Sequence, residues 1–306
     1  MIVCLGVLVA DVVAKPVDAL PKRGTLELIE RMELHIGGNA ANSAAVLAKL
    51  GLPVMLIGKV GDDSFGTFLV EGLAKLGVDT RAVATDPHAP TSVSLVTVHS
   101  DAERSFLHVA GANATLKSED IDWESLAGAR LFHVAGLQLL TGLEGEGVGT
   151  VLAEAQKRGM VTLLDTVMNP RSAGWSGLVP ALLHLDWFVP SFDEIQQLCG
   201  KATVTEQIAA CRAVNPVLNM VVKMGGEGCW VAEAGKEPKL VPAEIGITVV
   251  DTLGAGDAWC AGFLAGLSQG RAAGEAAALA NKVGAACVQA LGATTGISRL
   301  EALLAA

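Results

Sequence analysis

Tyrosine is absent from this 306-residue chain, aromatic residues make up only 4%, and basic side chains are outnumbered by acidic ones. The net charge of −10 argues against a protein that holds nucleic acid on a broad basic surface. No apolar run approaches the roughly 18 residues that a membrane-spanning helix needs. Residues 1–6 carry no basic leader, so we expect a buried strand there and not a signal peptide.

Cysteine and histidine are present but lack the spacings of metal sites. The six cysteines form no CxxC pair, so we expect neither a disulfide framework nor a zinc site, and we predict a reducing cytoplasm. The six histidines show no HExxH pattern, and we interpret them as structural or solvated. The pattern GxxxxGK[ST] is also missing, which excludes a P-loop enzyme.

Apolar residues make up 51% of the chain, enough for a sizeable core. Strand and helix signals alternate, which predicts a parallel sheet covered by helices on both faces. The predicted strands are 1–9, 54–60, 131–134, 161–164, 187–189 and 220–223, and the predicted helices are 39–50, 65–76, 147–158, 193–198 and 204–214. No linker or repeat divides the chain, so residues 1–306 are expected to form one domain.

Two stretches interrupt this alternation. Residues 12–36 and 91–109 each contain extended segments around a turn, and we interpret them as antiparallel hairpins inserted into the α/β body. They predict a small β-sheet lid over the carboxyl edge of the main sheet. The edges of such a lid could pair with a second copy of the chain, so a homodimer is expected.

The segment Asp251-Thr252-Leu253-Gly254-Ala255-Gly256-Asp257 carries the strongest chemical signal. The β-branched run 247–250 predicts a strand that ends there, and a buried helix is expected to start near Ala258. Glycines before a helix start let backbone amides converge on an anion such as phosphate. Asp257 beside such a site suits a general base that takes a proton from an attacking hydroxyl. The alternative is an aspartate that merely caps the helix.

A second glycine motif, Gly37-Gly38-Asn39-Ala40-Ala41-Asn42, opens the alanine-rich helix 39–50. Asn39 and Asn42 are three residues apart and share a helix face, so both amides could bind hydroxyl groups. Alternatively, Asn39 is an ordinary N-cap. Asp11 follows the first strand, at the sheet edge where open α/β folds bind ligands.

Segments 37–51 and 251–259 together resemble the two signatures of the PfkB, or ribokinase-like, carbohydrate kinase family, in the same order and at the same separation. The likeness extends over the whole chain. It implies a ribokinase-like, Rossmann-type α/β three-layer sandwich with a small β-sheet lid. It also implies a sugar bound between lid and body and ATP bound near the C-terminal half.

The resemblance also implies a role for individual residues. The catalytic base is Asp257, and the anion hole is the backbone of Gly254, Ala255 and Gly256. The residues expected at the sugar are Asp11, Gly37, Gly38, Asn39, Asn42 and Arg104. Those expected at the nucleotide are Lys223, Gly225, Gly228, Thr252 and Asn281, with Asp165, Asn169 and Arg171 as further polar groups on that side. Arg104 on the second hairpin could instead be a solvated arginine.

For metals, the family's Asn-x-x-Glu motif maps onto Ser191-Phe192-Asp193-Glu194. Glu194 is kept, which implies a water-mediated contact with Mg²⁺, whereas Ser191 departs from the family's asparagine. Many family members also use a monovalent cation near the positions of Asp251 and Gly292-Ala293, so Asp251 is a candidate ligand of K⁺.

The sequence thus predicts transfer of a phosphoryl group from MgATP to a hydroxyl of a sugar or sugar-derived acid. A nucleoside kinase of the same family is the nearest alternative. A non-catalytic sugar sensor is a third possibility, against which the retained Asp257 argues. A nicotinamide-dependent dehydrogenase would need GxGxxG after the first strand, and Gly6 is followed by no such pattern.

Overall fold

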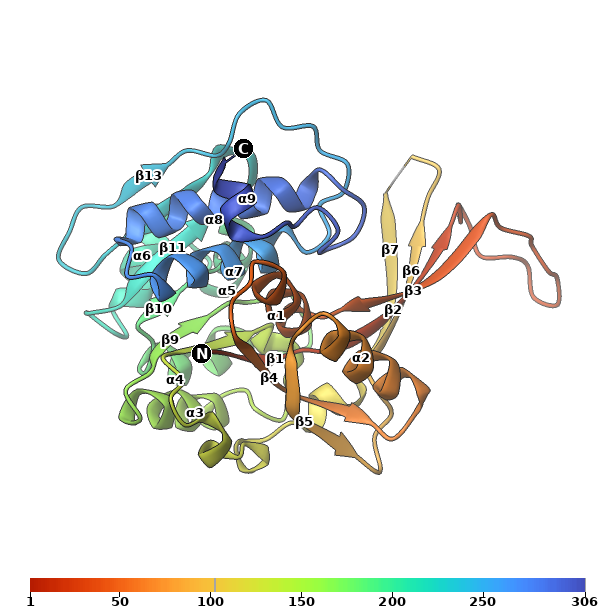
Figure 1. Cartoon of the computed structure of the whole chain (residues 1–306), viewed down its shortest axis with the longest axis horizontal. Coiled ribbons are helices and arrows are strands. Elements are labelled where there is room, and N and C mark those ends of the chain that lie inside the picture. The colour runs from red at the N-terminus through yellow and green to blue at the C-terminus, as the bar shows by residue number, and fades with distance from the viewer. Residues whose placement is uncertain (102, 306) are drawn as a thin grey trace.

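The computed structural model describes residues 1–101 and 103–305 and shows an α/β body from which a smaller sheet projects (Figure 1). In the described residues the main sheet has nine strands in the order β13-β12-β11-β10-β9-β8-β1-β4-β5. All neighbours are parallel except β11–β12 and β12–β13. These strands are β1 (Ile2–Gly6), β4 (Val54–Gly61), β5 (Asp79–Asp86), β8 (Leu131–Ala135), β9 (Val161–Leu164), β10 (Trp187–Phe188), β11 (Asn219–Lys223), β12 (Cys229–Ala232) and β13 (Lys239–Val241).

Helices cover both faces of this sheet, because its strands are apolar on both sides. One buried cluster packs α1, α2, α7 and α8 against one face, and a second packs α3, α4, α5 and α6 against the other. The helices are α1 (Asn39–Lys49), α2 (Ser64–Lys75), α3 (Glu146–Lys157), α4 (Gly174–Leu182), α5 (Phe192–Cys199), α6 (Val204–Arg212), α7 (Ala255–Ser268), α8 (Ala273–Val288) and α9 (Leu300–Ala305). The predicted three-layer α/β sandwich is confirmed. Within residues 1–101 and 103–305, no helix combines the length and apolar character that crossing a membrane requires.

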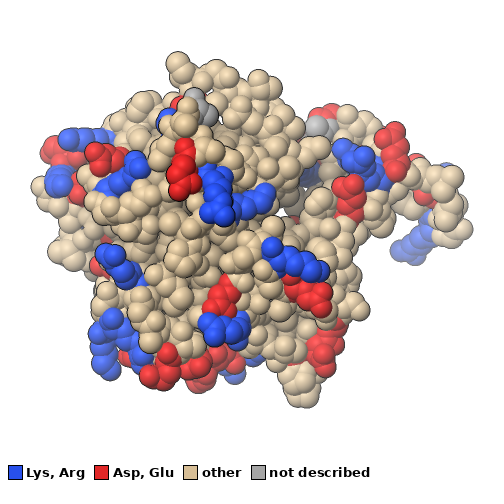
Figure 2. All heavy atoms as spheres, in the orientation of Figure 1, with Lys and Arg blue, Asp and Glu red and all other residues tan. Residues whose placement is uncertain are grey.

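The smaller sheet, which we call the lid, has the order β3-β2-β6-β7. Its strands are β2 (Val9–Lys15), β3 (Arg31–Gly37), β6 (Val93–Val98) and β7 (Arg104–Val109). β2 pairs antiparallel with β3, β6 pairs antiparallel with β7, and β2 lies parallel to β6. In the space-filling view, acidic and basic side chains are interspersed over both body and lid (Figure 2).

The predicted continuous strand 1–9 is wrong at its end. β1 stops at Gly6, and β2 starts at Val9 in the other sheet, so one apolar run contributes to both sheets. The crossing point is held by Asn113, whose Oδ1 accepts from the Leu8 backbone N–H (3.1 Å) and whose Nδ2 donates to the Leu8 carbonyl (2.8 Å). Hydrophobicity alone could not reveal this break, because both segments are buried.

The predicted strand 247–250 is also wrong, because this segment is irregular. Val249 and Val250 are 61% and 52% exposed. The backbone N–H groups of Val250 and Asp251 donate to the Val288 carbonyl at the end of α8, so they are satisfied without a neighbouring strand. β-branched residues favour strands only where a partner strand is available. The following helix, α7, begins at Ala255, three residues earlier than Ala258.

Candidate active site

A cleft of about 840 Å³ lies between the lid and the carboxyl edge of the main sheet. Its walls come from β2, β6 and β7 of the lid and from α1, α7 and the loops after β9 and β11 of the body. Most of the predicted site residues meet here: Asp11, Gly38, Asn39, Asn42, Asp165, Asn169, Ser191, Glu194, Lys223, Gly225, Thr252, Gly254, Ala255, Gly256 and Asp257. Segments more than 200 residues apart in sequence therefore share one cavity.

Asp257 lies at the floor of the cleft in the first turn of α7 and is 6% exposed. Asn39 Nδ2 donates to its Oδ1 (2.9 Å), and Asn42 Nδ2 donates to its Oδ2 (2.8 Å). Ser43 Oγ donates to the Asp257 backbone carbonyl (3.2 Å). Asn39 and Asn42 share a helix face as predicted, and in the structure both amides orient the Asp257 carboxylate. The residue that caps α7 is Gly254, so the capping alternative for Asp257 is wrong.

The pKa of Asp257 is raised to about 7. Burial is the main cause and the charge of Asp165 adds to it, whereas the amides of Asn42 and Asn39 and the ammonium of Lys223 act in the opposite direction. A general base works best when its pKa lies near the working pH, because it is then ionised yet still basic enough to take a proton. The environment of Asp257 meets this condition.

The start of α7 has the features of an anion site. Gly254 precedes the helix with φ of 71°, a left-handed conformation that favours glycine, and a Cβ at this position would overlap the side chain of Ala293. A Cβ at Gly256 would lie 3.4 Å from Lys223 Nζ, so an ammonium group stands beside this turn. Backbone N–H groups, the helix dipole and a lysine thus converge on one place.

Lys223 is held in position by a buried ion pair with Asp165. Its Nζ donates to Asp165 Oδ1 (2.8 Å), with the two side chains 11% and 2% exposed. Burial alone would lower the pKa of Lys223, but the charge of Asp165, with a further contribution from Glu194, raises it above its ordinary value. The lysine therefore keeps its positive charge next to the anion site.

The glycine pair before α1 allows the lid to approach the body closely. A Cβ at Gly37 would overlap the Asp11 carboxylate, and one at Gly38 would overlap the Val7 backbone. Gly38 has φ of 94° and is the N-cap residue of α1, without a side-chain cap. The N-cap alternative for Asn39 is therefore wrong, because Asn39 already lies inside the helix.

The lid contributes a polar group of its own to the cleft. Burial raises the pKa of Asp11 to about 6, although a hydrogen bond from Ser94 and the charge of His35 act against this shift. Ser94 Oγ and His108 Nδ1 are 3.1 Å apart, and both residues line the cleft. Our interpretation of the histidines as structural or solvated missed His108. Its position opposite Ser94 in the β6–β7 register could have signalled a shared polar face.

A second cavity of about 340 Å³ adjoins the cleft and is lined by residues that were expected at the nucleotide. Gly225, Gly228, Thr252 and Asn281 line it, as predicted, and Lys223 borders both cavities. The amide of Asn281 is engaged within the protein: Oδ1 accepts from Trp259 Nε1 (2.7 Å), and Nδ2 donates to the Pro242 carbonyl (2.8 Å). Asn281 therefore lines the groove with an amide that is held in place by hydrogen bonds within the protein.

The predicted Mg²⁺ contact, Glu194, lies in the cleft beside the loop after β9. Its Oε2 accepts from Thr166 Oγ1 (3.0 Å) and from the Ser191 backbone N–H (2.8 Å). Ser191 caps α5, and Glu194 completes a capping box with it. Glu194 and Asp165 place carboxylate oxygens in the same cleft, which fits a hydrated Mg²⁺ held through water.

Arg104 and Asp251 lie outside the residues that line the cleft. Arg104 Nη2 donates to Asp251 Oδ1 (2.7 Å), and both residues border a separate cavity of about 350 Å³ between the lid and the segment 291–295. Arg171, also predicted on the nucleotide side, is exposed and lines neither cavity, whereas Asn169 lines the cleft. The expected contact of Arg104 with the sugar thus differs from the structure, because the buried Asp251 carboxylate binds the Arg104 guanidinium.

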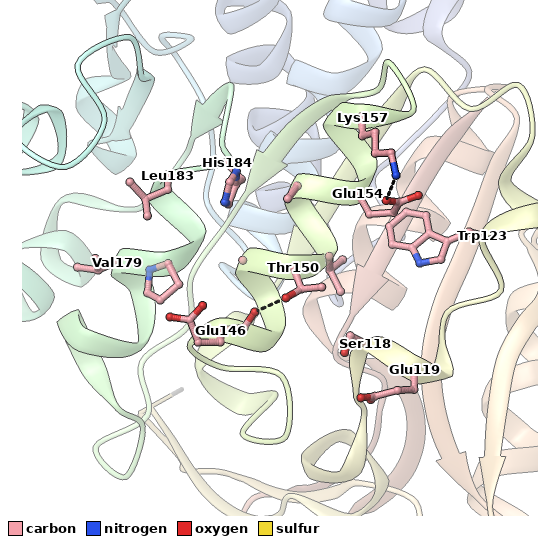
Figure 3. Close-up of a pocket in the computed structure, with 14 residues that line it drawn as sticks. Ser118, Glu119, Trp123, Glu146, Thr150, Glu154, Lys157, Val179, Leu183 and His184 are labelled. Atoms are coloured by element: carbon pink, nitrogen blue, oxygen red, sulfur yellow. Dashed lines mark hydrogen bonds and ion pairs between the residues drawn. The ribbon is translucent and has the colours of Figure 1, made fainter.

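A further hollow of about 720 Å³ lies between α3 and α4, away from Asp257 (Figure 3). Trp123, Glu146 and His184 line it, and the Glu154–Lys157 ion pair (3.5 Å) stands on its rim. None of the residues predicted for catalysis or binding lines this hollow.

The comparisons with known proteins agree with this geometry. The model of the pfkB family carbohydrate kinases matches residues 1–300. A sugar kinase of Archaeoglobus fulgidus is 31% identical over 259 residues, covering 83% of this chain and 98% of that protein. A ribokinase of Arabidopsis thaliana is 28% identical over 316 residues, covering 99% of this chain and 80% of that protein. The structure of an Arabidopsis thaliana ribokinase with ribose and ATP superposes with a TM-score of 0.86 at 26% identity, covering 99% and 97% of the two chains.

The chain belongs to the pfkB family of carbohydrate kinases. It is a phosphotransferase with an alcohol group as acceptor, which confirms the predicted family and reaction class.

Proposed function

We propose that this kinase transfers the γ-phosphoryl group of MgATP to a hydroxyl of a neutral ring sugar, with Asp257 as the general base. The observation that carries the proposal is the Asp257 carboxylate itself. It is buried, oriented by Asn39 and Asn42, and has a pKa raised to about 7 beside the N-terminus of α7. A carboxylate with these properties next to an anion site is suited to activating a hydroxyl for attack on a phosphoryl group.

The reaction needs two ligands that meet at Asp257. The sugar occupies the cleft between Asp11 and Asp257, and the nucleotide occupies the adjoining groove. Glu194 and Asp165 would hold Mg²⁺ through water, and the ion would supply positive charge beside the phosphate groups. Asp257 takes the proton of the attacking hydroxyl. The N–H groups at the start of α7 and the Lys223 ammonium then stabilise the charge of the transferring group.

The charges along the cleft favour a neutral sugar over a sugar acid. Among the described residues that line the cleft, Lys223 is the only lysine or arginine. It is paired with Asp165. The lid arginine that could have bound a carboxylate, Arg104, is paired with Asp251. Asp11 adds a negative charge at the lid end, which suits hydroxyl donors and repels an anionic substrate.

A coupled assay of ADP release tests the substrate class. We expect turnover with at least one of D-ribose, 2-deoxy-D-ribose and D-fructose, and a kcat/KM for 2-dehydro-3-deoxygluconate at least about tenfold lower, because one unfavourable charge contact costs about a factor of ten. A preference for the sugar acid, or for adenosine, would contradict the proposed substrate. ATP consumption that is independent of every acceptor would contradict the proposed mechanism.

We also propose that two copies associate through the outer face of the lid. The side chains of Met32, Leu34, Leu107 and Val109 alternate with those that face the body and are 39–63% exposed. Apolar side chains gathered on one sheet face suit a protein interface. Light scattering after size-exclusion chromatography is expected to give a dimer for the wild type and a monomer for Leu107→Asp. A wild-type monomer at micromolar concentration would contradict this proposal.

For the compartment, we propose the cytoplasm. All six cysteines have free thiols, and five of them are buried. Unpaired thiols suit a reducing compartment. Fusion to a fluorescent protein and fractionation of the native host is the direct test, and recovery outside the cytoplasm would contradict the proposal.

A further inference from the structure

The Asp251 carboxylate, in the segment before the anion site, accepts hydrogen bonds from three N–H donors. Its Oδ1 accepts from the Leu253 backbone N–H (2.8 Å) and from Arg104 Nη2 (2.7 Å). Its Oδ2 accepts from the Gly292 backbone N–H (2.8 Å). The side chain is only 3% exposed, so water contributes little to its solvation.

Asp251 is ionised despite this burial. Burial raises its pKa, but the hydrogen bonds from Gly292, Leu253 and Arg104 together lower the pKa below the ordinary value for aspartate. A buried carboxylate of this kind needs a positive partner, because an unpaired buried charge is strongly destabilising. Arg104 is that partner, with its own side chain 24% exposed.

The other charged or titratable residues that line this cavity are all on the lid: Lys15, Arg31, Glu33 and His35. Glu33 pairs with Arg31 (3.5 Å) and with His35 (3.1 Å) on the same strand of the lid. Among the described residues, Asp251 forms its ion pair with Arg104. This contact joins the lid to the body.

These residues do not fit a potassium site. K⁺ is held by oxygen lone pairs that point at the ion. Both carboxylate oxygens of Asp251 accept hydrogen bonds from N–H donors, and the guanidinium of Arg104 would repel a second cation in contact with the same carboxylate. The expectation that Asp251 binds K⁺ therefore disagrees with the structure.

We propose that the Arg104 guanidinium takes the place of a monovalent cation beside Asp251, so that this kinase works without potassium and completes its anion site when the lid closes. Arg104 starts strand β7 of the lid, whereas Asp251 lies three residues before Gly254 in the body. The ion pair thus forms when the lid rests on the body. Arg104 is a positioning residue, because it acts on the reaction through Asp251 and the following turn.

The proposal concerns the carbohydrate kinase reaction and holds for whichever sugar is accepted. A first test uses the wild type alone. The melting temperature Tm and the rate of turnover with the best sugar of the panel above are compared in KCl and in choline chloride at equal ionic strength. We expect the two salts to give the same values. Activation or stabilisation by KCl would overturn the proposal, and the Tm readout remains informative even if no sugar of the panel is turned over.

The second test removes the guanidinium with Arg104→Met. In choline chloride we expect kcat to fall by about 10- to 100-fold, the range for losing a hydrogen bond to a charged group. KCl is then expected to restore much of kcat and to raise Tm, because the vacated position beside Asp251 can now take an ion. The double variant Arg104→Met, Asp251→Asn is expected to lose this response to KCl.

Arg31→Met is the matched control, since it removes the same charge from the same lid without touching Asp251. We expect it to behave as the wild type in both salts. A loss of activity in Arg104→Met without any response to KCl would show a merely structural tie and would overturn the proposal. Equal behaviour of the two arginine variants would overturn it as well. The wild-type comparison requires no variant, so the proposal can fail even where Arg104→Met does not fold.

Discussion

The two ends of the cleft are built on different principles. At the body end, Asp257, Asn42 and Ser43 are at most 6% exposed and bind one another across two packed helices. At the lid end, Phe106 is 56% exposed, and the sheet behind it has an open outer face. In the proposed mechanism, the body therefore supplies the chemistry from a preformed arrangement, whereas the lid supplies the surface that distinguishes one acceptor from another.

The largest effect is expected from Asp257→Asn at the body end. An amide cannot take the proton of the attacking hydroxyl, so kcat is expected to fall by about 10²- to 10⁴-fold, the usual contribution of a general base. The affinity for the sugar, measured by calorimetry, is expected to change little. If kcat stayed within about a factor of ten of the wild type, Asp257 would not be the base.

The next largest effect is on stability, again in the body. Lys223→Met leaves Asp165 buried without its partner and is expected to lower the free energy of unfolding by about 3–5 kcal/mol. The exposed pair of Lys236 and Glu233 (64% and 35% exposed) gives the control, because Lys236→Met is expected to cost less than about 1 kcal/mol. Denaturant titrations measure both. Equal losses in the two variants would show that burial of the ion pair does not matter.

At the lid end, Gly37→Ala is expected to displace the Asp11 carboxylate, because the added Cβ occupies its place. We expect KM for the sugar to rise by about 10- to 100-fold, the range for a lost hydrogen bond to a charged group, with a smaller change in kcat. Gly24→Ala lies on the same hairpin with no atom within 4 Å of the new Cβ. Its φ of +79° makes the variant strain the exposed turn, but it leaves Asp11 in place and is expected to leave KM unchanged. A fall in kcat alone would mean that the lid end takes part in the chemistry.

The smallest expected effect is on the pH dependence of kcat/KM, which distinguishes Asp257 at the body end of the cleft from Asp11 at the lid end. Asp257 must be ionised to act as a base, and its pKa of about 7 predicts that kcat/KM falls as the pH drops below about 7, tenfold per pH unit. Below about 6 the slope is expected to steepen, because Asp11 becomes protonated as well. In Asp11→Asn the second change of slope should vanish. A single slope in both proteins would show that the charge of Asp11 is not needed.

The local parts of this structure could be predicted from the sequence, and the long-range partners could not. Helical periodicity placed Asn39 and Asn42 on one face, but it could not indicate that their partner, Asp257, comes more than 200 residues later. The same is true of Arg104, whose ion pair spans 147 positions. Propensity failed at 247–250, because a strand also needs a neighbouring strand, which lies beyond the information in a local segment.

The Asn113 side chain forms hydrogen bonds with both backbone groups of Leu8, and this has a mechanical consequence. It fixes the start of lid strand β2 to the body. Asp11 lies three residues from this attachment, whereas Arg104 starts β7 opposite Val98, at the end of β6. For a lid that turns about Leu8, Asp11 would be displaced less than Arg104, so the proposed substrate contact would be disturbed less than the ion pair with Asp251.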